Sequence, residues 1–98
     1  MSSSKEYRDY VLEQLQDLSD ITFKQMMGEY LLYYKGVLFG GIYDDRLLVK
    51  IVSSNQKYGM EESIPYENAK PMYLVESIDN RDELKQIVLD TYEGLKKR

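Results

Sequence analysis

The chain has 98 residues, with 13 Lys or Arg, 17 Asp or Glu and a formal net charge of −4, and it contains ten Tyr but no His, Cys or Trp. These counts exclude catalysis by imidazole or thiolate groups, and they exclude zinc, copper or haem sites that need such ligands. The length suits one core, so we expect residues 1–98 to form a single domain. No apolar run approaches the length of a membrane span, and we expect a cytoplasmic protein.

The first predicted element is an amphipathic helix that begins after Ser4. The Ser4 hydroxyl suits the N-cap because it can accept a hydrogen bond from a free amide of the first turn. Ser19-Asp20 ends the pattern. The apolar positions that recur at helical spacing are Tyr7, Val11, Leu15 and Leu18.

A meander of antiparallel strands is predicted next, because short apolar and aromatic runs alternate with turn residues. The turns are expected at Gly28, Lys35-Gly36 and Asp44-Asp45. If the last two are two-residue turns, Tyr34 lies opposite Val37 and Tyr43 lies opposite Arg46. The predicted strand cores are Thr22 to Met26, Glu29 to Tyr34, Val37 to Tyr43 and Arg46 to Val52.

The second half of the chain predicts a short helix, an irregular polar stretch, one more strand and a long helix. Ser53-Ser54-Asn55 begins the short helix, and Pro71 opens the strand Met72 to Val75. Asn80 and Glu83 have the spacing of a capping box at the start of the long helix. The predicted fold class is therefore α+β: a two-layer sandwich with an antiparallel sheet of about five strands and the N- and C-terminal helices packed on one face.

Strand alternation assigns the sheet residues to two faces. The face expected under the helices holds Leu31, Tyr33, Leu38, Gly40, Ile42, Leu47, Val49 and Ile51. The other face is rich in aromatic residues, which are typical of interfaces, and it supplies a predicted interaction surface of Tyr30, Tyr34, Phe39, Tyr43, Arg46 and Lys50. Two alternatives stay open: the segment from Tyr58 to Pro71 covers this face, or a one-residue slip at Gly36 exchanges the faces of the preceding strand.

A second candidate is a recognition rim near the strand ends, made of Lys24, Met26, Glu29, Lys70 and Met72. Methionine repacks around varied partners, although it also fills gaps in cores. Gly40-Gly41 lacks the surrounding residues of a phosphate-binding loop, so we expect a bulge or a close backbone approach there.

The acidic pairs Asp44-Asp45 and Glu61-Glu62 are the candidates for a carboxylate-dependent enzyme or a cation site. Adjacent acids on a turn usually face solvent, and we assign no catalytic, cofactor-binding or metal-ligating residue. Aromatic residues interleaved with basic ones also suggest a stacking platform for single-stranded nucleic acid, against which the acidic net charge argues. The basic residues are Lys24, Lys35, Arg46, Lys50 and Lys57.

The order of several short motifs resembles the N-terminal domain of the TfoX/Sxy competence regulators. The motifs are Lys24-Gln25-Met26-Met27-Gly28-Glu29-Tyr30, Lys35-Gly36-Val37, Phe39-Gly40, Asp44-Asp45-Arg46-Leu47 with Lys50, and Ala69-Lys70-Pro71-Met72. The resemblance implies a two-layer α/β fold and brings no catalytic residues. Full regulators of this type carry a second, helical domain and control transcription for DNA uptake, and no segment here corresponds to that domain.

These observations together predict a non-enzymatic protein-interaction or regulatory module without a cofactor. It is expected to act through a protein partner or through self-association as a homodimer. The alternatives are a direct nucleic-acid binder and a small carboxylate-dependent enzyme.

Overall fold

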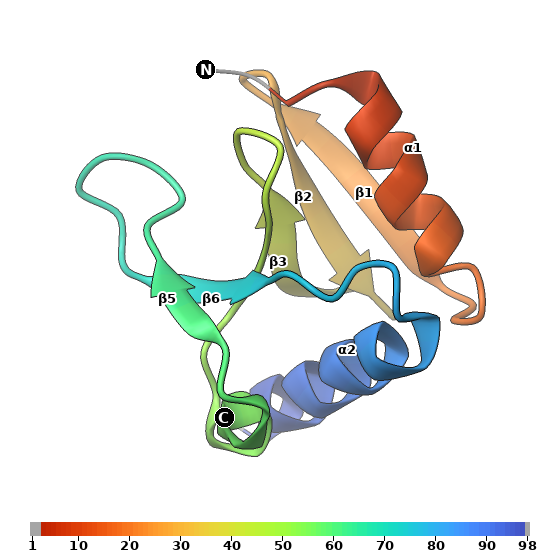
Figure 1. Cartoon of the computed structure of the whole chain (residues 1–98), viewed down its shortest axis with the longest axis vertical. Coiled ribbons are helices and arrows are strands. Elements are labelled where there is room, and N and C mark those ends of the chain that lie inside the picture. Colours follow the sequence, from red (N-terminus) through yellow and green to blue (C-terminus); the bar gives the residue numbers. More distant parts are fainter. Residues whose placement is uncertain (1–2, 98) are drawn as a thin grey trace.

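The computed structural model describes residues 3–97 and has an α+β fold, as predicted (Figure 1). The helices are α1 (Lys5–Gln14), the 3-10 helix η1 (Ser53–Tyr58) and α2 (Arg81–Lys96). The antiparallel sheet has the strand order β1 (Ile21–Met26), β2 (Glu29–Tyr34), β3 (Val37–Ile42), β4 (Leu47–Val49), β6 (Met72–Val75), β5 (Glu61–Ser63). It has six strands rather than about five because Glu61–Ser63, predicted as irregular, pairs with β6.

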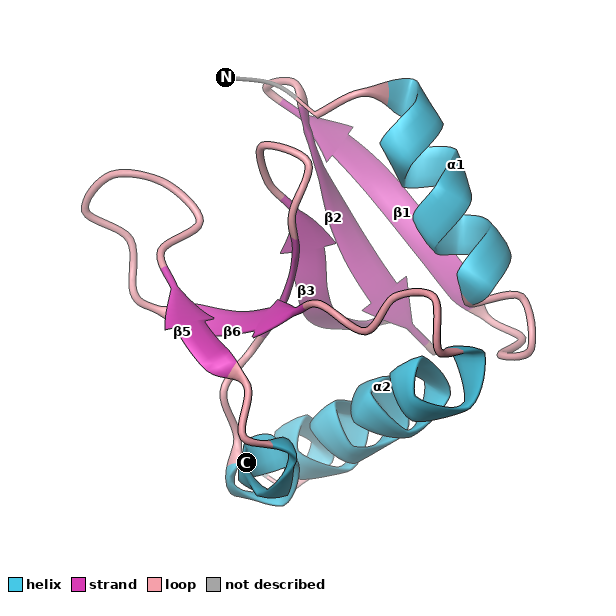
Figure 2. Cartoon of the chain, viewed as in Figure 1, coloured by secondary structure: helices cyan, strands magenta, loops and turns pink. Residues whose placement is uncertain are grey.

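Both long helices begin at the predicted caps. The Ser4 hydroxyl accepts a hydrogen bond from the Tyr7 amide at 3.1 Å, and the Asn80 side chain accepts one from the Glu83 amide at 3.2 Å. The helices pack on one side of the sheet and share its core (Figure 2). The buried core residues of this layer are Val11 in α1, Leu84, Ile87 and Val88 in α2, and Leu15 and Leu18 in the turn that follows α1, which ends earlier than the predicted Ser19-Asp20. No helix within residues 3–97 has the length and apolar character that a membrane crossing requires.

Three two-residue turns connect the first four strands. Their residues all have positive φ: 53° and 83° at Met27-Gly28, 50° and 80° at Lys35-Gly36, and 54° and 55° at Asp44-Asp45. Such turns match the right-handed twist of the flanking strands. The predicted pairings of Tyr34 with Val37 and of Tyr43 with Arg46 are confirmed.

A bulge in β3 makes part of the predicted face assignment wrong. Tyr33 pairs with Leu38, but Leu32 pairs with Gly40, so Phe39 is an extra residue in β3. Consequently Tyr30, Leu32, Tyr34 and Phe39 are buried in the helix-covered core, while Leu31, Tyr33 and Leu38 are only partly buried and lie on the opposite side. Beyond the bulge the assignment is correct: Ile42, Leu47 and Val49 are in the core.

The two glycines beside the bulge lie against neighbouring backbone, as predicted. A Cβ on Gly40 would collide with the carbonyl oxygen of Leu48, and a Cβ on Gly41 would lie 2.6 Å from the carbonyl oxygen of Tyr30. Neither position has room for a side chain, so the strands on both sides approach β3 closely.

Candidate interaction face

The side of the sheet away from the two helices carries the best candidate site, and we call it the open face. Lys24 lies opposite Leu31, Leu31 opposite Gly41, and Tyr33 opposite Leu38, so all of these positions share that face. The loop of residues 64–71, between β5 and β6, lies on the side of the sheet opposite α1 (Figure 1). Side chains of this loop and of the strands together form two adjoining hollows on the open face.

Arg46 holds this loop in place. Its Nη1 donates hydrogen bonds to Ser63 Oγ at 2.6 Å and to the carbonyl oxygen of Ile64 at 3.2 Å, and its Nη2 donates to the carbonyl oxygen of Pro65 at 3.4 Å. Its Nε donates to the carbonyl oxygen of Tyr43 at 3.2 Å. A guanidinium has its donors in a fixed planar arrangement that suits several acceptors at once. Arg46 therefore braces the loop.

The first hollow has a volume of about 870 Å³, and we call it the methionine hollow. It is lined by Met26, Met27, Glu29, Leu31, Tyr43, Asp44, Arg46, Ile64, Pro65, Tyr66 and Glu67. Six large apolar side chains are exposed among residues 3–97, and four of them line this hollow: Met26 at 48%, Met27 at 95%, Ile64 at 53% and Tyr66 at 64%. Exposed apolar side chains are thus concentrated at this place.

The second hollow has a volume of about 590 Å³, and we call it the lysine hollow. Its own lining residues are Leu38, Gly40, Lys50, Ile51, Ala69, Lys70, Pro71 and Met72. Leu31, Tyr43, Pro65 and Tyr66 line both hollows. The Tyr43 and Tyr66 rings lie at this boundary with centroids 6.2 Å apart, so the two hollows meet at a pair of aromatic side chains.

A comparison of the sequence with models of protein families identifies the family of this chain. The model of the TfoX N-terminal domain matches residues 13–95 of the 98. The chain belongs to the TfoX N-terminal domain family. The resemblance predicted from the motifs is confirmed, and membership of a generally non-enzymatic family supports a regulatory module of the TfoX type. No curated protein matches the chain.

The open face of this TfoX N-terminal domain has charges of opposite sign at its two ends. Glu29, Asp44 and Glu67 line the methionine hollow, whereas Lys50 and Lys70 line the lysine hollow. Both carboxylate oxygens of Glu29 accept hydrogen bonds from the Asp44 amide at 3.2 Å, and Oε1 also accepts one from Ser3 Oγ at 2.7 Å. The Glu29 carboxylate is therefore held in a defined position at the rim.

Tyr43 lies between the two charged ends and keeps its proton. Burial raises the pKa of its hydroxyl above the ordinary value of 10.0, and nearby Tyr66, Glu29 and Tyr33 raise the pKa further. At neutral pH the Tyr43 hydroxyl is therefore an uncharged group that donates or accepts hydrogen bonds.

The structure corrects half of the predicted interaction surface. Tyr30, Tyr34 and Phe39 belong to the helix-covered core, with exposed fractions of 2%, 7% and 0%, because of the bulge in β3. Tyr43 lines both hollows and Lys50 lines the lysine hollow. Arg46 lines the methionine hollow and braces the loop. The alternative that residues between Tyr58 and Pro71 cover this face is realised in part, since the loop lies against it.

The members of the predicted recognition rim lie on the open face. Met26 and Glu29 line the methionine hollow, Lys70 and Met72 line the lysine hollow, and Lys24 lies opposite Leu31 on the same face. The sequence interpretation missed Ile64-Pro65-Tyr66 and Glu67. The signal for them was an apolar and aromatic triplet within an otherwise polar stretch.

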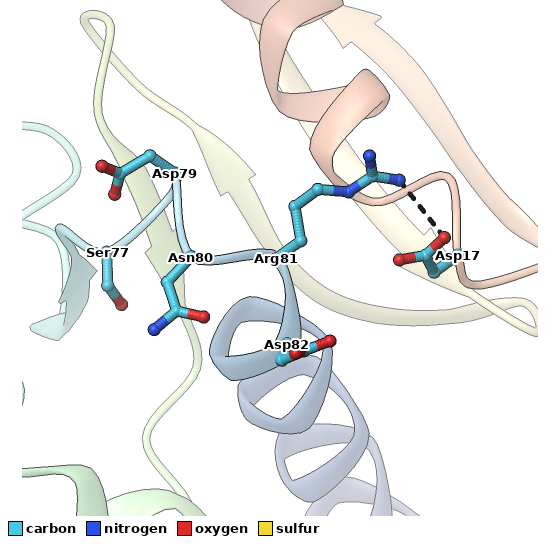
Figure 3. Close-up of a pocket in the computed structure, with 6 residues that line it drawn as sticks. All are labelled: Asp17, Ser77, Asp79, Asn80, Arg81 and Asp82. Atoms are coloured by element: carbon cyan, nitrogen blue, oxygen red, sulfur yellow. Dashed lines mark hydrogen bonds and ion pairs between the residues drawn. The ribbon is translucent and has the colours of Figure 1, made fainter.

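A third, polar hollow lies between the end of α1 and the start of α2 (Figure 3). Arg81 Nη2 approaches Asp17 Oδ1 at 3.2 Å, and this ion pair links the two helical regions. The side chains that line the hollow are Asp17, Ser77, Asp79, Asn80, Arg81 and Asp82. They include helix-capping and ion-pairing groups, so the hollow is accounted for by the helix junction.

The acidic pairs occupy structural positions. Asp44-Asp45 forms the turn after β3, as expected, and Asp45 Oδ1 accepts a hydrogen bond from the Ser4 amide at 2.8 Å. Glu61-Glu62 lies on the edge strand β5. Within residues 3–97 no group of three or more acidic side chains gathers in a way that would hold a metal ion.

Proposed function

We propose that this TfoX N-terminal domain is a non-enzymatic regulatory module that binds a segment of another protein on the open face. The observation that carries the proposal is the concentration of four exposed apolar side chains, Met26, Met27, Ile64 and Tyr66, around one hollow. Exposed apolar groups gathered at one concave place typically mark a binding surface. Two of the four are methionines, whose flexible side chains adapt to a partner.

The braced loop supports binding without large rearrangement. Arg46 fixes the loop through Ser63, Ile64 and Pro65, and Pro65 is buried. Because the walls of the hollow are already ordered before binding, association does not carry the entropic cost of ordering them. The open face therefore offers a formed recess with an apolar centre and polar ends.

Affinity capture with matched variants tests the proposal. The test variant combines Met27→Ser with Tyr66→Ser. The control variant is Tyr10→Ser, which changes an exposed aromatic residue on α1, away from the hollows. A protein retained from the native cell by wild type and by the control, but lost with the test variant, supports the proposal. Equal retention by all three forms contradicts it.

Sedimentation of the same three forms examines self-association. A wild-type dimer that the test variant converts to monomer would show that a second copy occupies the open face instead of another protein. Circular dichroism of each form shows whether the fold is intact, which we expect because Met27 and Tyr66 are largely exposed.

Nucleic-acid binding receives less support. Tyr30, Tyr34 and Phe39 are buried in the core and therefore cannot form part of the predicted stacking platform. Lys57 forms an ion pair with Asp90 at 3.1 Å and lines neither hollow, and three acidic side chains line the methionine hollow. Phosphate-binding surfaces are normally basic, so the open face suits a polypeptide better.

A further inference from the structure

We infer that the segment bound on the open face carries opposite charges at its two ends, with a basic end on the methionine hollow, an acidic end on the lysine hollow and an apolar side chain between them. This inference rests on the proposed function and specifies the chemistry of the partner. It depends on charge complementarity along the open face.

The methionine hollow is acidic because its carboxylates are in excess. Glu29, Asp44 and Glu67 line it, and Arg46 is the one basic residue among its lining residues. The Arg46 guanidinium donates its hydrogen bonds to the 63–65 segment and to the carbonyl oxygen of Tyr43, which places its donors toward the chain itself. A basic side chain of a ligand is the group that complements this end.

The lysine hollow is basic because no acidic residue is among its lining residues. Lys50 and Lys70 contribute the charges, and none of the ion pairs found within residues 3–97 involves either of them. A carboxylate of a ligand would therefore meet two ammonium groups without displacing an internal partner.

The centre of the open face is apolar. Leu31, Tyr43, Pro65 and Tyr66 line both hollows, and the two tyrosine rings lie side by side there. Aromatic side chains at the centre of a recess are typical of positions that contribute most of the binding energy. An apolar side chain of the ligand between its two charged ends would contact these residues.

A selection from a displayed library of random peptides tests the charge pattern. Three immobilised forms are compared: wild type, the double variant Lys50→Glu with Lys70→Glu, and the control Lys5→Glu with Lys97→Glu. The control changes the net charge by the same amount at two exposed helix ends. Amide chemical shifts of Leu31 and Tyr43 in each form show whether a selected peptide occupies the open face.

We expect wild type and the control to select peptides with basic and acidic residues on opposite sides of an apolar residue. The double variant should select peptides that are basic at both ends, and it should bind the wild-type peptides about tenfold more weakly at low salt, since two attractions become repulsions. The loss should shrink as salt is added, because exposed charges are screened.

Three outcomes overturn the inference. Peptides that occupy the open face without a charge pattern, or with the same pattern in the double variant, overturn it and leave the proposed function standing. Recovery of no peptide that occupies the open face also overturns it, and the proposed function is then decided independently by the capture experiment with Met27→Ser and Tyr66→Ser. A dimer that the same variant disrupts overturns it in favour of a second copy.

Discussion

The side-chain amide of Asn55 in η1 donates a hydrogen bond to Thr91 Oγ1 in α2 at 2.9 Å, and neither residue is exposed to solvent. The same amide donates to the carbonyl oxygen of Lys50 at 2.8 Å, and Asn55 Oδ1 accepts from the Val52 amide at 3.2 Å. Thr91 Oγ1 in turn donates to the carbonyl oxygen of Ile87 at 2.7 Å. This buried network joins the chain after β4 to the middle of α2, and it fixes the backbone at Lys50, whose side chain lines the lysine hollow.

Replacing Asn55 by Leu should lower the free energy of unfolding by about 2–4 kcal/mol, because the Val52 amide and the Lys50 carbonyl would be left buried without their partner. Urea unfolding followed by circular dichroism measures the change. The exposed neighbour Gln56→Leu is the control, with an expected change within about 0.5 kcal/mol. Similar unfolding midpoints for the two variants would show that the network contributes little.

Gly94→Ala should destabilise the protein, although alanine favours helices over glycine by about 1 kcal/mol. A Cβ at this position of α2 would lie 2.5 Å from Ser54 Oγ and 2.6 Å from Val52 Cγ2, so η1 would have to move away from the helix. We expect a loss of about 1–3 kcal/mol from overpacking. The sign of the change decides: a gain in thermal stability would mean that η1 does not pack on α2 as described.

Phe39→Ala should cost about 3–5 kcal/mol, and Leu38→Ala should cost clearly less, because Phe39 is fully buried while Leu38 lies on the open face. The two residues are adjacent, so the comparison tests the bulge directly. Denaturant unfolding of both variants provides the measurement. A strand without the bulge would reverse the order, since Leu38 would then face the helices.

Arg46→Lys should loosen the loop of residues 64–71 while keeping the charge. A lysine ammonium has no planar set of donors and would not reach Ser63, Ile64 and Pro65 together. We expect faster amide hydrogen exchange at Ala69, whose amide bonds to the carbonyl oxygen of Tyr66 at 3.1 Å, and a loss of about 1–2 kcal/mol in unfolding free energy. Lys24→Arg, on the same face but outside the loop contacts, is the control and should leave the exchange unchanged.

The stability of the protein should fall as the pH rises from 10 to 12. Burial and the hydrogen bond to Asp90 Oδ2, at 2.5 Å, raise the pKa of Tyr58 from 10.0 to about 12. A folded-state pKa above the unfolded value means that the contribution is complete below the unfolded pKa and is lost as the pH passes the folded pKa. Tyr58→Phe should therefore show a shallower decline in the urea midpoint over this range. Parallel curves for the two forms would contradict a raised pKa at Tyr58.

Local patterns in the sequence predicted most elements of this fold. Ser4 and Asn80 identified the helix starts because capping depends on side chains within one turn, and Lys35-Gly36 identified a hairpin for the same kind of local reason. Edge strand β5 was not predicted, because Glu61-Glu62-Ser63 has no apolar alternation and pairs with β6 only in the folded chain.

The site was harder to predict because it depends on register and on a loop. One inserted residue, Phe39, moved the aromatic side chains of β2 from the expected surface into the core. Gly40-Gly41 predicted a bulge or a close backbone approach, but this pattern did not identify which residue is inserted, so the faces were assigned as for a regular strand. Strand alternation nevertheless placed Tyr43 on the surface, and positions near strand ends suggested Met26, Glu29, Lys70 and Met72; all five line the hollows. The contribution of Tyr66 depends on the hydrogen bonds of Arg46, which only the folded structure reveals.

The position of Ser3 has a practical consequence for every binding measurement on this domain. Its amide donates to the carbonyl oxygen of Gly28 at 3.1 Å, and its hydroxyl donates to Glu29, so the start of the described chain lies at the rim of the methionine hollow. The C-terminal end of α2 lies on the far side of the molecule (Figure 1). A purification tag, fluorophore or surface linker attached near Ser3 would therefore lie close to the hollow that a ligand must enter. The same label placed after α2 would be far from it.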